Sequence, residues 1–290
     1  MISMSTLAQQ NLTPETLWQL GRVTPLGISK DGKLLVYKVG TPSVEENKIN
    51  SKYYTIPVQG GNATLVENYK SLLADKNVSP DGKNLLFSKE VKVEKLLGKD
   101  LYPELSKTTA QVYTGLDYRH WDTWNDGTHN HVFYSENKKD AIGIDIMPNE
   151  PFDAPQKPFG SDEDYIWSPD GTKIIYVCKK KAGTAYATST NTDLYEYDLA
   201  TKITKNLTEG NLGYDTHPTF SPQGDLSWLQ MKRDGYEADK NDIIVRHRGQ
   251  DLNITSNWDG TVDSFTWSND GKKVYFIAPI KGTKQLFEVN

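Results

Sequence analysis

A four-residue turn recurs along this chain and constrains its fold more than any other feature. The clearest copy, Ser168-Pro169-Asp170-Gly171, stands between an apolar segment and an alternating run of β-branched and aromatic residues. Pro presets φ near −65°, Asp accepts hydrogen bonds from nearby amides, and Gly adopts the positive φ that closes a hairpin. Related copies begin at Ser29, Ser79, Ser221 and Ser268. Each copy predicts a turn between two antiparallel strands.

The spacing of these turns indicates a structural repeat. Successive turn serines are 50, 89, 53 and 47 residues apart. The long step is close to two periods, and near its midpoint lies Trp124-Asn125-Asp126-Gly127, which we interpret as a degenerate sixth copy. A second pair of strand-like runs, Asp193–Asp198 and Lys202–Leu207, flanks the polar turn Leu199–Thr201. Each repeat is therefore expected to contain four strands.

A repeat of about 50 residues with four strands is the size of one propeller blade. We therefore expect an all-β fold, a β-propeller with about six four-stranded blades, the last incomplete, so that the ring does not close within these residues. Thr13 followed by Pro14 predicts the N-cap of a short helix through Leu20, in an N-terminal segment 1–24 that precedes a propeller domain 25–290. The expected blades are 25–75, 76–117, 118–160, 161–212, 213–259 and 260–290.

Composition and charge exclude several classes of partner. Acidic residues outnumber basic ones by 38 to 33 and no basic run stands out, which argues against nucleic acid. Apolar runs such as Tyr275–Ile280 are far shorter than the roughly 18 residues that span a bilayer, so we expect no membrane partner. The single cysteine, Cys178, continues a predicted strand, where a thiol is expected to pack rather than react. Ser5–Gln10 resembles the stub near a secretory cleavage site, which favours a periplasmic or secreted protein; a cytoplasmic location stays open.

Motifs that carry catalysis are missing from these 290 residues. There is no G-x-S-x-G, glycine-rich phosphate loop, H-E-x-x-H or C-x-x-C, so we expect no catalytic residue and no cofactor here. His129-Asn130-His131 could place two imidazoles on one strand face, but no third ligand is evident. We therefore expect no metal site and interpret this segment as a surface hairpin.

Several longer segments resemble the propeller of prolyl oligopeptidase family serine peptidases, in the bacterial dipeptidyl and acylaminoacyl peptidase branch. The resemblance runs from about Leu12 to Asn290. It implies a propeller that caps a C-terminal α/β-hydrolase domain carrying Ser, Asp and His. We expect that domain in cis as a partner, and we expect this chain alone to hydrolyse nothing. The segments that carry the resemblance are Arg119–Gly127, Ser189–Leu199, Asn206–Gly210, Tyr214–Pro222 and Met231–Lys240.

The resemblance also implies that the propeller admits short peptides and holds the substrate's N-terminus. Because a carboxylate suits a peptide ammonium, Glu237 and Asp239 are candidates, with Tyr236, in a loop between strands. The alternative is that the two carboxylates pair locally with Arg233 or Lys240 and brace the blade.

A second group of candidates could line a substrate opening. Arg119, Trp121 and Trp124 combine aromatic surface with a guanidinium, which is typical of binding sites. The alternative is that they pack a blade edge.

Two other functional classes are consistent with a propeller. A stand-alone scaffold of the Tol or WD type would bind a protein partner, and the turns and composition fit it equally well; the segments around Trp121 and Tyr236 do not. A propeller enzyme with its own central site, as in some sugar hydrolases, would need inward carboxylates repeated from several blades. The aligned repeats show no such carboxylate.

Overall fold

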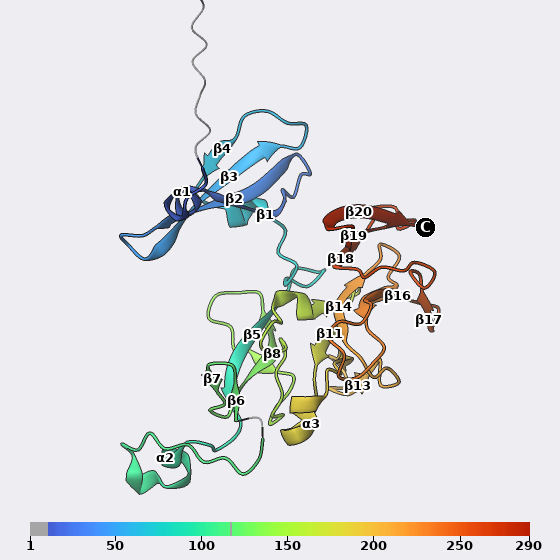
Figure 1. Ribbon diagram of the computed structural model, residues 1–290. Coiled ribbons are helices and arrows are strands. Elements are labelled where there is room, and N and C mark those ends of the chain that lie inside the picture. Colours follow the sequence, from blue (N-terminus) through green and yellow to red (C-terminus); the bar gives the residue numbers. More distant parts are fainter. Residues whose placement is uncertain (1–10, 117) are drawn as a thin grey trace, which may run out of the picture. The chain divides into compact units, whose positions relative to one another are not determined.

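The computed structural model describes residues 11–116 and 118–290 (Figure 1). Ser5–Gln10, on which the expectation of export rests, lies outside the described residues. The chain forms two compact units that divide after Asp75. The first begins with helix α1 (Pro14–Gln19), whose N-cap Thr13 accepts a hydrogen bond from the amide of Thr16 at 3.2 Å. The predicted short helix is confirmed.

One four-stranded antiparallel sheet makes up most of the first unit. Its strands follow one another in chain order, and a short 3-10 helix comes after them. Strand β1 begins three residues before the predicted start of the propeller at residue 25. The elements are β1 (Arg22–Ile28), β2 (Leu34–Ser43), β3 (Lys48–Pro57), β4 (Thr64–Val66) and η1 (Tyr69–Leu72).

The second unit contains four more sheets of three or four strands and one small hairpin, counted over its described residues. The first sheet pairs β5 (Asn84–Lys92), β8 (Thr128–Glu136) and β9 (Ile144–Asp145). The next has β10 (Tyr165–Trp167), β11 (Lys173–Cys178), β12 (Asp193–Asp198) and β13 (Thr204–Asn206). The last two have β14 (Asp215–Phe220), β15 (Leu226–Gln230), β16 (Asp242–His247) and β17 (Gln250–Asn253), then β18 (Ser264–Trp267), β19 (Val274–Ile280) and β20 (Thr283–Val289). Other elements are α2 (Gly98–Leu101), η2 (Pro103–Leu105), β6 (Arg119–His120), β7 (Thr123–Trp124), η3 (Asp162–Asp164) and α3 (Gly183–Thr188).

The repeated turns have the geometry that their residues predict. Ser168 Oγ donates to Asp170 at 2.6 Å and accepts from the amide of Lys173 at 3.0 Å, while Gly171 has φ +69°. The copies at Ser29, Ser79 and Ser268 repeat this pattern. In each copy the serine hydroxyl therefore links the turn to the start of the next strand.

Replacing Ser168 with alanine is expected to lower the free energy of unfolding by about 1 to 2 kcal/mol. The change removes both hydrogen bonds of a buried hydroxyl and leaves the Lys173 amide without its acceptor. Urea unfolding measures the effect. The same substitution at exposed Ser88, in β5, serves as the control and should change stability by less than about 0.5 kcal/mol. Equal stabilities of the two variants would contradict the role assigned to the turn.

The number of blades differs from the sequence expectation. The structure has five blade sheets rather than about six, because β5 pairs with β8 along its whole length, from Asn84 with Glu136 to Lys92 with Thr128. The expected blades 76–117 and 118–160 are thus one blade, and residues 93–127 are an insertion between two of its paired strands. Trp124–Gly127 closes this insertion instead of forming a blade turn. Two of the five sheets also have three strands instead of the expected four.

The cores of the second unit lie between successive sheets. Along β11, Ile174 and Tyr176 pack toward the β5-β8-β9 sheet, whereas Ile175 and Val177 pack toward the β14–β17 sheet. This alternation is the period of two expected of a strand that is buried on both faces. Cys178, fully buried in the first of these cores, packs as expected, and burial raises its pKa well above the usual value. The fold is therefore an all-β propeller of stacked blades.

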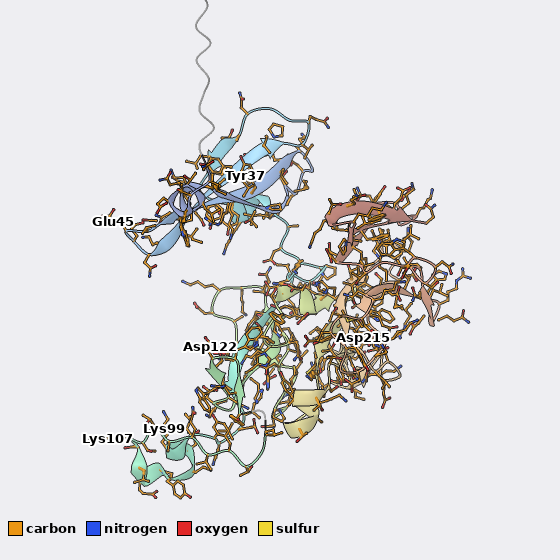
Figure 2. The ribbon with its side chains drawn as sticks, in the orientation of Figure 1. Tyr37, Glu45, Lys99, Lys107, Asp122 and Asp215 are labelled. Atoms are coloured by element: carbon orange, nitrogen blue, oxygen red, sulfur yellow. The ribbon has the colours of Figure 1, made fainter. Side chains whose placement is uncertain are left out.

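A polar cluster is buried at the start of β14. Asp215, labelled in Figure 2, accepts hydrogen bonds from the indole of Trp228 at 2.7 Å, from Gln230 at 2.8 Å and from Asn211 at 3.0 Å. Burial raises the pKa of Asp215 to about 6, although these donors oppose the shift. The cluster satisfies the polar edge of Trp228, whose ring is fully buried in the core.

Candidate functional site

A cavity of about 600 Å³ lies where the insertion 93–127 returns to its blade. The end of β5 and both ends of the insertion line it, together with the start of β8, the loop 151–158 and the segment 181–186 around α3. Its charged lining residues are Glu90, Glu94, Arg119, Asp126, Asp153, Lys157 and Lys181. The volume is within the range of roughly 300 to 1,000 Å³ that is usual for small-ligand pockets.

The base of the insertion is closed by Gly127. Its carbonyl accepts hydrogen bonds from the amides of Val93 at 2.9 Å and Glu94 at 3.1 Å, and its φ is +83°. A Cβ at this position would lie 2.3 Å from the carbonyl oxygen of Glu94. Only glycine fits so close to the neighbouring backbone, and the contact sets where Glu94 enters the cavity.

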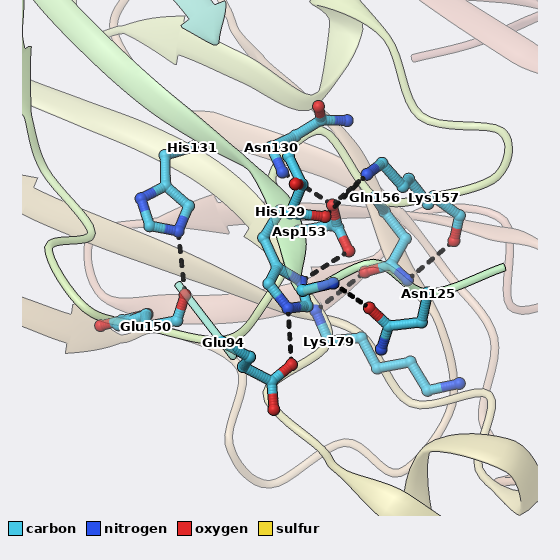
Figure 3. A network of polar contacts seen from close by, with 12 residues as sticks. Glu94, Asn125, His129, Asn130, His131, Glu150, Asp153, Gln156, Lys157 and Lys179 are labelled. Carbon is cyan, nitrogen blue, oxygen red and sulfur yellow. Dashed lines mark hydrogen bonds and ion pairs between the residues drawn. The ribbon is translucent and has the colours of Figure 1, made fainter. Parts of the chain in front are cut away.

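His129, on β8, connects the two sides of the cavity (Figure 3). Its Nε2 lies 3.1 Å from Glu94 Oε2, and its Nδ1 lies 3.2 Å from Asp153 Oδ2. Asp153 also accepts from the amide of Asn130 at 2.7 Å and pairs with Lys157 at 3.2 Å. The network therefore ties the insertion to the loop 151–158.

The protonation of this network follows from its geometry. Burial lowers the pKa of His129, but the hydrogen bonds and charges of Asp153 and Glu94 outweigh it, so the pKa is raised. Burial by itself raises the pKa of Asp153, yet His129, the Asn130 amide and Lys157 hold that pKa below its usual value. Both arrangements favour a charged imidazolium between two carboxylates.

An aromatic group forms another part of the cavity lining. The rings of Tyr113 and Trp124 are 6.2 Å apart, and Tyr118 packs against both. The Arg119 guanidinium lies 5.6 Å from the centre of the Trp124 ring. Stacking of this kind holds a guanidinium in place while leaving its donors available.

The structure brings one of the two groups of candidates together and places the other elsewhere. Arg119, Trp121 and Trp124 all line the cavity, and all three are exposed. Tyr236, Glu237 and Asp239 lie in the loop between β15 and β16, outside the cavity lining.

The loop between β15 and β16 shows the local pairing that was the alternative for Asp239. Arg233 Nε donates to both oxygens of Asp239 at 2.9 Å, and its guanidinium lies 4.1 Å from the Tyr236 ring centre. Asp234 accepts from Ser189 and Thr190, just after α3. Glu237 is exposed. Their part in binding stays a prediction.

The interpretation of His129-Asn130-His131 as a surface hairpin is wrong. Both histidines are buried on β8, a central strand of its sheet, and β8 pairs with β5 across the long insertion. His131 is held by Asp145 at 2.8 Å and by the carbonyl of Glu150 at 2.9 Å. Over the described residues, no group of three or more His, Cys, Asp or Glu side chains is placed to hold a metal ion.

Sequence reasoning missed Glu94, His129 as its partner, and Asp153. No local motif marks them, because Glu94 and Asp153 are 35 and 24 residues from His129. The available signal was the pair of histidines at alternate positions, because residues two apart on a strand share one face.

Curated relatives of this chain are dipeptidyl peptidases, although no family model matches it. Dipeptidyl-peptidase 5 of Porphyromonas gingivalis is 35% identical over 336 aligned positions, which cover 99% of this chain and 49% of that protein. Dipeptidyl-peptidase 5 of Porphyromonas endodontalis is 34% identical over 79% of this chain and 40% of its own length. The chain spans about half the length, or less, of these curated relatives.

A solved structure supports the fold. An acylaminoacyl peptidase from Pyrococcus horikoshii superposes with a TM-score of 0.60 at 14% identity, over 94% of this chain and 45% of that one.

No helix within the described ranges is long and apolar enough to cross a membrane. The chain is therefore a relative of dipeptidyl-peptidase 5, and the share of that protein that it covers is consistent with the propeller portion of a prolyl oligopeptidase family peptidase.

Proposed function

We propose that this chain is the non-catalytic propeller of a dipeptidyl peptidase and that its cavity holds short peptides for cleavage elsewhere in the protein. The names of the Porphyromonas relatives support the reaction class. The observation that carries the proposal is the cavity itself, in which a partly exposed carboxylate and a stacked guanidinium meet aromatic walls.

Glu94 is suited to bind the substrate's terminal ammonium. One of its oxygens is hydrogen-bonded to His129, and its side chain is still 40% exposed. The hydrogen bond from His129 already fixes the orientation of the Glu94 carboxylate. Its remaining lone pairs can therefore accept from a ligand cation with a smaller loss of conformational entropy on binding.

Arg119 is suited to a peptide carbonyl or carboxylate. Its position over Trp124 aligns a planar set of donors along the aromatic wall. Together, Glu94 and Arg119 supply opposite charges for a ligand whose amino end is positive and whose carbonyl groups are negative dipoles.

Bond cleavage belongs, in this proposal, to an α/β-hydrolase domain in the same protein. The 290 residues contain no G-x-S-x-G motif, and removing a serine peptidase triad lowers kcat about a millionfold. The propeller would limit access by size, since a cavity of about 600 Å³ accommodates short peptides and excludes folded proteins.

Replacing Glu94 with glutamine is expected to weaken binding of a free-amine dipeptide amide about tenfold. The variant keeps the shape of the side chain and loses the charge that attracts the ammonium. Isothermal titration calorimetry of this chain with alanyl-alanine amide measures the effect. The N-acetylated peptide is expected to bind equally weakly to wild type and variant.

Glu237→Gln is the matched control, because Glu237 is an exposed glutamate outside the cavity lining. We expect it to bind like wild type. If Glu237→Gln loses affinity and Glu94→Gln does not, the ammonium site lies in the loop between β15 and β16. If wild type binds no dipeptide amide, the cavity is not a peptide site.

A further inference from the structure

An exposed tryptophan occupies the tip of the small hairpin at the cavity. Trp121 follows β6, and the pairs Arg119 with Trp124 and His120 with Thr123 close the hairpin around it. Its φ is +49° and its exposed fraction is 66%. A bulky residue in this left-handed region is strained relative to glycine, so neither backbone geometry nor burial accounts for a tryptophan here.

A second exposed aromatic residue meets it from another segment. Phe159 is 78% exposed and follows Pro158, which lines the cavity. The Trp121 and Phe159 rings pack edge to face with centres 5.4 Å apart. Trp121 itself lines the cavity, so the aromatic pair, Trp121 with Phe159, lies at its margin.

Each residue of this pair is positioned by contacts of its own segment. Lys157, two residues before Phe159, pairs with Asp153, and Asp153 is bonded to His129. Trp121 lies on the same hairpin as Trp124 and Arg119, which form the aromatic wall. Two large rings are therefore kept in water next to charged groups suited to a peptide backbone.

We propose that the aromatic pair determines substrate specificity by contacting an apolar side chain of the bound peptide. This inference rests on the proposed function and adds the substrate class: peptides with aromatic or large aliphatic residues. Edge-to-face rings offer a flat apolar surface to a third ring or an aliphatic chain. Binding such a side chain removes from water aromatic surface that the free protein exposes.

The test compares two ligands of equal charge and length on this chain. Calorimetry with phenylalanyl-phenylalanine amide and seryl-serine amide is expected to show at least a tenfold preference for the phenylalanine peptide in wild type. Trp121→Gly is expected to reduce that preference to about twofold or less. Glycine adopts the positive φ of this position without steric strain, so the variant is expected to fold at least as stably as wild type.

Two further variants define the outcome. Phe159→Ser is expected to reduce the preference as well, and Tyr102→Ser, at an exposed ring outside the cavity lining, is expected to leave it unchanged. If wild type binds both peptides equally, or Trp121→Gly keeps the full preference, the specificity role is wrong while the peptide site stands. If wild type binds neither peptide, the proposed function fails first.

Discussion

Replacing Gly127 with alanine is expected to lower the free energy of unfolding of the second unit by about 3 kcal/mol and to weaken dipeptide binding about tenfold. The backbone of Gly127 is at φ +83°, and an added Cβ would lie 2.3 Å from the carbonyl oxygen of Glu94. To relieve that clash, either Glu94 must move or the two hydrogen bonds that the Gly127 carbonyl accepts from the amides of Val93 and Glu94 must break. Urea unfolding and calorimetry with alanyl-alanine amide measure the two effects.

Gly82→Ala is the matched control for this experiment. Gly82 lies in the same unit with a similar φ of +75°, but a Cβ there would have open space around it. The control should lose about 1 kcal/mol from backbone strain and bind the dipeptide amide like wild type. If the two alanine variants are equally stable and bind equally, the contact between Gly127 and Glu94 does not organise the cavity.

Replacing Asp164 with asparagine is expected to stabilise the protein by about 4 kcal/mol at pH 8 and by almost nothing at pH 4. Burial of Asp164, which is 4% exposed, raises its pKa from 3.8 to about 7; the charge of Glu163 adds to the shift, and the amide of Gln156 opposes it. The folded protein therefore retains a proton that the unfolded chain releases, and stability falls between about pH 4 and pH 7. Asparagine never ionises, so the variant avoids this loss.

Urea unfolding of both proteins at pH 4 and pH 8 checks the sign. Asp170→Asn provides the opposite case, because the hydroxyl of Ser168 and the amide of Thr172 lower the pKa of Asp170. That variant should be less stable than wild type at pH 8. A stability difference between Asp164→Asn and wild type that is the same at both pH values would show that folding does not raise the pKa of Asp164.

Local chemistry made the turns, the first helix and most strands predictable. A Ser-x-Asp-Gly turn closes through bonds within six residues, as the contacts of Ser168 with Asp170 and Lys173 show. The N-cap at Thr13 likewise depends on one neighbour, Thr16. The β-branched and aromatic residues after the Ser168 turn predicted a strand, which β11 confirms; the cores on either side show that it is buried on both faces.

The error in blade number has a physical cause. A degenerate turn and the end of an insertion look alike in sequence, since both need a glycine at positive φ preceded by side chains that accept hydrogen bonds. Asn125 accepts from the amide of Gly127 at 2.8 Å, much as a turn residue would. What distinguishes them is the pairing of β5 with β8 across 35 intervening residues, and such pairing depends on long-range contacts that leave no local pattern.

Sequence alone determined the class of fold, the period of the blades and the resemblance to peptidase propellers, because each depends on residues close together in the chain. It also identified Arg119, Trp121 and Trp124 as members of one group. Only the tertiary structure decided that these residues share a cavity with Glu94 and that His129 holds that glutamate, whereas Asp239 pairs with Arg233. A binding site is formed where separate segments converge, and the partners that orient its charges are chosen by the packing of the whole blade.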